Sequence, residues 1–136
     1  MAKKIPGQGM SKSTPPEDST NWVGDTFSGS AGGQTGNLEI RWHRSDSILL
    51  IDVLRYMITG NGTRNSANIN IVVQADGSRN WKLGSNDRKQ DGIWHTWSVR
   101  GQLAIGNATL ITVKVEIVFD KPGIDDRTII TRKYGV

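Results

Sequence analysis

The sequence contains no cysteine. This absence excludes disulfide bridges, cysteine zinc sites and a cysteine nucleophile, and it is consistent with a reducing compartment. Histidine is nearly as scarce, because the chain has only His43 and His95, whose separation excludes a His-x-x-x-His metal motif. We therefore expect that neither a metal ion nor a cofactor is needed for folding or for function.

Long apolar runs are also missing. No stretch approaches the roughly 18–20 apolar residues that a membrane-spanning helix requires. Residues 1–18 contain lysines but lack the apolar stretch of a secretion signal. The sequence therefore predicts a protein without a transmembrane segment, and the cytoplasm or a virion is the location most consistent with it.

Enzyme motifs are absent as well. The chain has no Gly-x-Ser-x-Gly elbow, no phosphate-binding P-loop and no dinucleotide-binding glycine pattern. Glu39, Asp52 and Glu116 are candidates for a glycosidase carboxylate pair, but nothing in the sequence singles out two of them. The Asp125-Asp126 pair follows a Pro-Gly turn and is more typical of a solvated loop than of a calcium site. The prediction is a protein that is not an enzyme.

What the chain has in abundance is glycine, with 16 residues against four prolines, together with apolar residues that alternate with polar ones. Alternation with period two indicates strands that are buried on one face. We predict strands at 38–43, 68–75, 93–99, 109–119 and 127–133, and a further short strand from Trp22 to Phe27. The fold class that follows is all-β, an antiparallel β-sandwich of jelly-roll or concanavalin-like type with at most one short helix.

Residues 45–60 fit two interpretations. The segment begins with a cap-like Ser-Asp-Ser and ends at Gly60, and Asp52, Arg55 and Thr59 fall on one helical stripe. It is also rich in Ile, Val and Tyr, as a strand buried on both faces would be. We favour a strand, because every clear element around the segment is a strand.

Residues 1–20 are predicted to form a flexible basic arm, and residues 21–136 a single sandwich domain. The arm contains Lys3, Lys4 and Lys12 among Gly, Ser, Thr and Pro, a composition that does not build a core. The whole chain has a net charge of +4, which favours an anionic partner. The three lysines are candidate anion contacts, with nucleic acid as a partner of the arm.

Tryptophan and basic side chains gather in residues 79–100. Tryptophan stacks on sugar rings and bases, and arginine pairs with anions, so this combination is typical of binding surfaces. The candidate ligand-binding residues are Trp81, Trp94, Arg79, Lys82, Arg88 and Lys89.

The strand pattern assigns these aromatic residues to different faces. In "IWHTWSV" (93–99), Ile93, His95, Trp97 and Val99 share the core side, and Trp94 lies on the opposite face with Thr96. Trp97 is therefore predicted to be in the core and Trp94 on the surface. His95 is predicted to be a hydrogen-bonded core or rim residue.

Three other predictions concern residues outside this strand. Trp81 follows the Asp76-Gly77 turn and fits binding and packing equally well. In "RWHR" (41–44), Trp42 is predicted to be in the core and both arginines to be solvated.

"QDGIWHTWSV" (90–99) resembles a strand of laminin G-like and related concanavalin-type sandwiches. The resemblance covers roughly residues 37–100, and its specific part is Asp91-Gly92-x-Trp94-His95. It implies a glycan- or ligand-binding sandwich in which the tryptophan and the histidine of this motif are structural. The chain departs from the family in its short length, its missing cysteines and its segment 109–123, and no binding residue is carried over.

Three functions are compatible with these observations. The first is a non-enzymatic, lectin-like binding module that recognises a glycan or another anionic or stackable ligand through exposed Trp and Arg. The second is a structural protein such as a small viral coat or virion protein, whose basic arm contacts nucleic acid or a neighbouring subunit of a homo-oligomer. The third is a membrane-headgroup-binding, pore-forming type of β protein with tryptophans at headgroup level.

Overall fold

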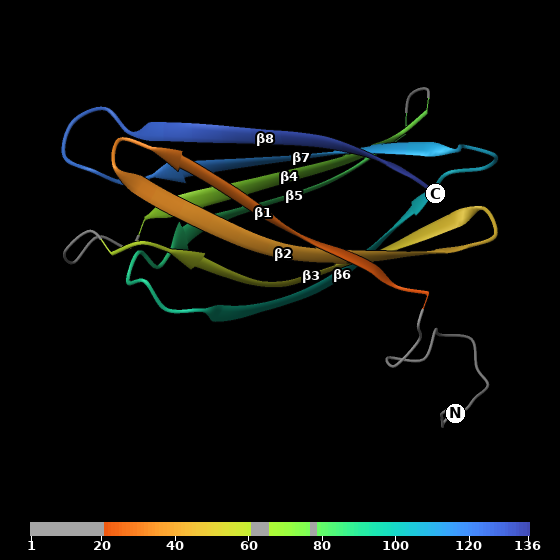
Figure 1. Ribbon diagram of the computed structural model, residues 1–136, viewed down its shortest axis with the longest axis horizontal. Coiled ribbons are helices and arrows are strands. Elements are labelled where there is room, and N and C mark those ends of the chain that lie inside the picture. The colour runs from red at the N-terminus through yellow and green to blue at the C-terminus, as the bar shows by residue number, and fades with distance from the viewer. Residues whose placement is uncertain (1–20, 61–65, 77–78) are drawn as a thin grey trace.

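The computed structural model describes residues 21–60, 66–76 and 79–136, which form two four-stranded antiparallel sheets packed face to face (Figure 1). The first sheet has the strand order β1-β2-β3-β6 and the second has the order β5-β4-β7-β8. The strands are β1 (Val23–Ala31), β2 (Gln34–Ser45), β3 (Ile48–Ile58), β4 (Ala67–Ala75), β5 (Asn80–Arg88), β6 (His95–Ala104), β7 (Leu110–Phe119) and β8 (Asp126–Gly135).

The predicted all-β sandwich is confirmed, and the described residues contain no helix. The five predicted strands and the predicted strand near Trp22–Phe27 correspond to β2, β4, β6, β7, β8 and β1. The core lies between the sheets because one side of each alternating pattern faces inward. On β7, for example, Ile111, Val113, Val115 and Ile117 are all buried. The arm predicted for residues 1–20, with Lys3, Lys4 and Lys12, lies outside the described residues.

The ambiguous segment 45–60 contains β3, so the interpretation as a strand is confirmed. The helix-like spacing of Asp52 and Arg55 has a structural cause. In a regular strand two residues three positions apart would lie on opposite faces. Here Ile40 pairs with Val53 and Glu39 pairs with Arg55, so Leu54 is an extra residue in a β-bulge. The bulge therefore brings Asp52 and Arg55 to the same outer face of the first sheet.

The two sheets are joined along both of their long edges. Where β1 lies against β8, Tyr134 donates a hydrogen bond to the Asp25 carboxylate, and Arg132 forms an ion pair with the same group. Where β5 lies near β6, the indole of Trp81 occupies the space beside Gly101 that a side chain would fill. Trp81 is partly buried and packs against the core.

Two predictions about individual residues are wrong. β6 begins at His95 rather than at residue 93, and the side chain of Ile93 is 60% exposed. The cause is a turn in which Gly92 has a φ of 75° and the Asp91 carboxylate accepts a hydrogen bond from the backbone N–H of Ile93. The prediction that Arg41 and Arg44 are solvated is also wrong, because both side chains are partly buried.

Arg44 connects three segments that are distant in the sequence. Its guanidinium group donates hydrogen bonds to the backbone carbonyls of Gly106, Ala108 and Val136. These carbonyls belong to the β6–β7 turn and to the C-terminal residue. A planar guanidinium with several donors suits this task because it satisfies carbonyls that the sheets leave unpaired.

Candidate ligand-binding face

The outer face of the first sheet carries a group of aromatic and charged side chains that contact one another. We call it the Trp–Arg face, and its members come from β2, β3 and β6 and from the residues just before β1 and β6. It consists of Trp22, Glu39, Arg41, Asp52, Leu54, Arg55, Trp94, Ser98 and Arg100. The strand register brings these residues together from four separate parts of the chain.

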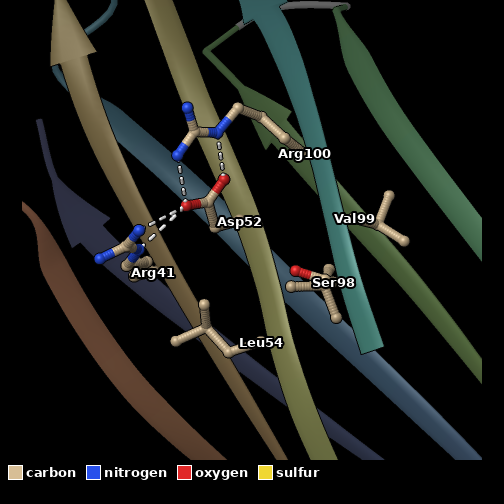
Figure 2. A pocket seen from close by; sticks show the side chains of 7 residues that line it. Arg41, Asp52, Leu54, Ser98, Val99 and Arg100 are labelled. Atoms are coloured by element: carbon tan, nitrogen blue, oxygen red, sulfur yellow. Dashed lines mark hydrogen bonds and ion pairs between the residues drawn. The ribbon is translucent and has the colours of Figure 1, made fainter. Parts of the chain in front are cut away.

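Asp52 binds two arginines of this face at once. It lies on β3 between Arg41 on β2 and Arg100 on β6, since the strand register pairs it with both. Arg41 Nε is 2.9 Å from Asp52 Oδ2, and Arg100 Nε and Nη2 lie 2.6 Å and 2.9 Å from Oδ1 and Oδ2. Figure 2 shows both guanidinium groups converging on the carboxylate.

The carboxylate of Asp52 is buried but remains ionised. Burial alone would raise the pKa of Asp52, because a charge is costly to remove from water. The hydrogen bonds and the positive charges of Arg100 and Arg41 outweigh burial, so the pKa lies below its ordinary value. Asp52 therefore fixes the positions of two arginines and is unsuited to act as a general acid near neutral pH.

Trp22 lies over this group. The guanidinium carbon of Arg41 is 4.4 Å from the centre of its indole ring, and that of Arg100 is 5.3 Å away. The His43 ring lies beside it, with a centroid separation of 5.5 Å. Cation–π contacts of this kind hold a half-buried indole in one orientation. Trp22 thus forms the first Trp–Arg–carboxylate stack, with Arg41 and Asp52.

A second stack lies further along the same face. The guanidinium carbon of Arg55 is 4.2 Å from the centre of the Trp94 ring. Arg55 also binds Glu39 through two hydrogen bonds, of 2.8 Å and 3.1 Å. The side chain of Arg55 is 46% exposed, so this pair contributes little to stability. Glu39 fixes the position of Arg55, and Arg55 in turn holds the ring of Trp94 on the outer face of the sheet.

A shallow depression of about 350 Å³ lies beside Asp52. It is lined by Arg41, Asp52, Val53, Leu54, Ser98, Val99 and Arg100 (Figure 2). Its position coincides with the bulge at Leu54, and β6 is irregular at the same level, between the partners of Val53 and Arg55. A bulge interrupts the regular ladder and re-aims side chains, which explains why the flat sheet is hollowed here.

The predicted ligand-binding residues do not form one site. Trp94 lies on the Trp–Arg face, as expected for a surface residue. Lys82 lies on the outer face of the second sheet, and Trp81 packs between the sheets. Arg79 is exposed and lines a separate depression of about 330 Å³, beside Asp76 and Ser47.

The remaining predicted residues lie near the β5–β6 connection. Arg88 places its guanidinium over the rings of Trp97 and Tyr56, at 5.1 Å and 5.5 Å. Lys89 is exposed, and its backbone N–H donates to the Tyr56 hydroxyl. Trp97 packs against the core, as predicted.

The Asp91-Gly92-x-Trp94-His95 motif forms a capped turn before β6. Asp91 accepts a hydrogen bond from Ile93 and lies 2.8 Å from Nε2 of His95, whose ring lies 5.4 Å from that of Tyr56. The hydrogen bond to His95 lowers the pKa of Asp91 below its ordinary value. His95 is thus a hydrogen-bonded residue at the rim of the core, as predicted.

The chain matches no protein-family model, no curated protein and no solved structure. The resemblance to laminin G-like domains therefore stays a prediction. Within the described residues, no group of three or more His, Cys, Asp or Glu side chains is placed to hold a metal ion. The same residues include no helix that is long and apolar enough to cross a membrane.

Sequence reasoning missed most of the Trp–Arg face. Trp22, Arg41, Arg55 and Arg100 are separated by up to 78 positions, and no local pattern links them. One signal was present in the sequence, because Asp52 interrupts an otherwise apolar run. A lone carboxylate in a strand of this composition requires cationic partners on its neighbouring strands.

Proposed function

We propose that the protein is a non-enzymatic binding module that holds a glycan on its Trp–Arg face. The observation that carries this proposal is the repetition of one arrangement. Trp22 with Arg41 and Asp52, and Trp94 with Arg55 and Glu39, are two Trp–Arg–carboxylate stacks on one surface. The depression beside Asp52 lies on the same surface.

The chemistry of the stacks suits a sugar. Indole rings stack on the apolar faces of sugar rings. Guanidinium and carboxylate groups on the same surface supply hydrogen-bond donors and acceptors for hydroxyl groups. Because these groups are already fixed by one another, little side-chain entropy is lost on binding.

The charge of the face favours an acidic glycan over a neutral one. Arg41, Arg55 and Arg100 are three cations, and Glu39 and Asp52 are two anions. One positive charge is therefore in excess on this surface. A ligand carboxylate or sulfate would balance it, and arginine is well suited to pair with such groups.

A binding role is also favoured over catalysis. Both oxygens of the Asp52 carboxylate accept hydrogen bonds from arginine, and both oxygens of Glu39 are bound by Arg55. A glycosidase needs one carboxyl group that holds a proton near neutral pH. The lowered pKa of Asp52 opposes that role.

The test is an array of neutral and acidic glycans, probed with the labelled full-length chain. We expect binding to one or more acidic glycans, weakened about tenfold by Trp94→Ala, in line with about 1–2 kcal/mol for a lost stacking contact. Trp94→Phe, which keeps an aromatic ring, should retain most of the binding.

A second pair of variants tests where on the protein the glycan binds, without removing a tryptophan or an arginine. Ser98→Trp fills the depression and should abolish binding. Thr131→Trp places the same bulk on the outer face of the second sheet and should have no effect. The proposal fails if no glycan binds above background, or if Ser98→Trp and Trp94→Ala both bind as the wild type does.

A further inference from the structure

The outer face of the second sheet differs in chemistry from the Trp–Arg face. Its cations are mainly lysines, Lys82 on β5, Lys114 on β7 and Lys133 on β8, and all three are exposed. We call these three residues the lysine face. The neutral side chains on the same surface include Asn70, Val72, Gln74, Thr112, Ile129 and Thr131, and its other charged residues include Glu116 and Arg127.

The strand register sets the spacing of the lysines. Lys82 and Lys114 flank Val72 in one cross-strand row, so two strand spacings separate them, roughly 10 Å. Lys133 pairs with Thr112, which places it one strand and two residues away from Lys114, roughly 8 Å. The lysines thus form an array that extends from one edge strand of the sheet to the other, in which each can contact a different charge of an extended ligand.

Carboxylates offset little of this charge. Glu116 lies on the same surface, but it accepts hydrogen bonds from Asn70 and Arg127 and forms an ion pair with Arg127. Asp87 is exposed at the irregular end of β5. No ion pair within the described residues engages Lys82, Lys114 or Lys133.

The domain as a whole also carries an excess of positive charge. Residues 21–136 contain 14 Lys and Arg against 11 Asp and Glu, an excess of three. Because the three lysines of the lysine face form no ion pair within the described residues, their charges remain available to attract an anionic partner.

We propose that the lysine face binds the phosphate backbone of a nucleic acid without reading its sequence. Lysine is a compact point charge that pairs with phosphate from many directions. No aromatic ring stands among the residues named on this face, so stacking on bases has no platform here. The ligand is thus held through its charges.

Binding through charges predicts how steeply the affinity falls with salt concentration. Each neutralised phosphate contributes about −0.9 to the slope of log K against log [salt] for duplex DNA, and about −0.7 for a single strand. Replacing all three lysines should reduce the magnitude of the slope by about 2 to 3. The wild type should then lose affinity more steeply than the triple variant as salt is raised from about 50 to 200 mM. The ratio of the wild-type association constant to that of the triple variant should fall about 40-fold over this range for a duplex and about 20-fold for a single strand.

The experiment measures fluorescence anisotropy of labelled single-stranded and duplex oligonucleotides of mixed sequence with the full-length chain. The variants are Lys82→Gln, Lys114→Gln, Lys133→Gln and their combination. Lys121→Gln is the matched control, because it removes the same charge from the β7–β8 loop, where Lys121 pairs with Asp126. A thermal melt of each variant checks the fold, and the single variants decide the question if the combination unfolds.

We expect each single variant of the lysine face to reduce the magnitude of the slope by the contribution of one phosphate contact, about 0.9 for a duplex and about 0.7 for a single strand. Lys121→Gln should leave the slope unchanged. The proposal is overturned if Lys121→Gln weakens binding as much as Lys114→Gln, since net charge alone would then explain it. It is also overturned if the triple variant keeps the wild-type slope. Lysine-dependent binding to heparin or to vesicles of anionic lipid, without binding to either oligonucleotide, would overturn it in favour of those partners.

Discussion

The indole of Trp81 on β5 fills the space in front of the α-carbon of Gly101 on β6. This contact lies between the edge strands of the two sheets, and it explains why glycine stands in the middle of an edge strand. It also gives Trp81 a packing role, one of the two roles that its position in the sequence allowed.

The close contact predicts that Gly101→Ala is destabilising. A methyl group at this position would overlap the indole, and overpacking of this kind costs about 1–3 kcal/mol. Gly24→Ala is the control, because a methyl group there would meet its nearest neighbours at 3.6 Å, an ordinary contact. Urea unfolding of both variants measures the difference, and equal stabilities would contradict the packing of Trp81.

The ion pairs of Asp52 predict a dependence of stability on pH. Because the pKa of Asp52 is lower in the folded chain than its ordinary value of about 3.9, the carboxylate stabilises the fold above that pH. The contribution is lost as the pH falls through the lower, folded value. In Asp52→Asn we expect a loss of about 2 kcal/mol at pH 7 and a weaker decline of stability below pH 4.

Urea unfolding between pH 2 and pH 7 measures this difference between Asp52→Asn and the wild type. Asp25 and Asp91 also have lowered pKa values, so part of the acid sensitivity should remain in the variant. Two parallel pH profiles would show that the carboxylate of Asp52 is not paired as described.

The hydrogen bond from Tyr134 to Asp25 connects β8 to β1 across the edge of the sandwich. Tyr134→Phe keeps the ring contacts with Trp42 and Phe27 but removes the hydroxyl, so we expect a loss of about 1–2 kcal/mol. The same hydrogen bond is the main cause of the lowered pKa of Asp25, which should therefore rise in the variant. NMR titration of the Asp25 carboxyl checks the second effect, and an unchanged pKa would contradict it.

The hydrogen bonds of Arg44 predict that a positive charge alone at this position does not maintain the stability of the fold. Lysine at this position keeps one positive charge but cannot reach three carbonyls from a planar group. Arg44→Lys should lower the stability by about 1–2 kcal/mol, whereas Arg79→Lys, at an exposed position, should change it by less than about 0.5 kcal/mol. Thermal melts of the two variants provide the comparison.

The sequence predicted the strands well because period-two patterns arise from the physics that places side chains in the core. Residues 109–119 alternate cleanly, and β7 occupies Leu110–Phe119. The pattern was misleading where the backbone departs from regular geometry. The turn at Asp91–Gly92 delays the start of β6 to His95, and the bulge at Leu54 imitates helical spacing in β3.

The binding face was harder to predict because it depends on which strands become neighbours. Arg41 and Arg100 are 59 positions apart, and they meet only because β2 and β6 both pair with β3. Proximity in the sequence grouped Trp81, Lys82 and Trp94 instead, and the fold assigns these residues to different surfaces. Strand order is the missing information, and local composition does not contain it.

The most direct test of the Trp–Arg face follows the indole N–H signals of all five tryptophans by ¹⁵N NMR, assigned through single Trp→Phe variants, during titration with the strongest acidic glycan from the array. The signals of Trp22 and Trp94 should shift in a saturable way. Those of Trp42, Trp81 and Trp97, which pack in or against the core, should stay in place. Saturable shifts at Trp81 or Trp97 with none at Trp22 and Trp94 would contradict the assignment of ligand binding to this face.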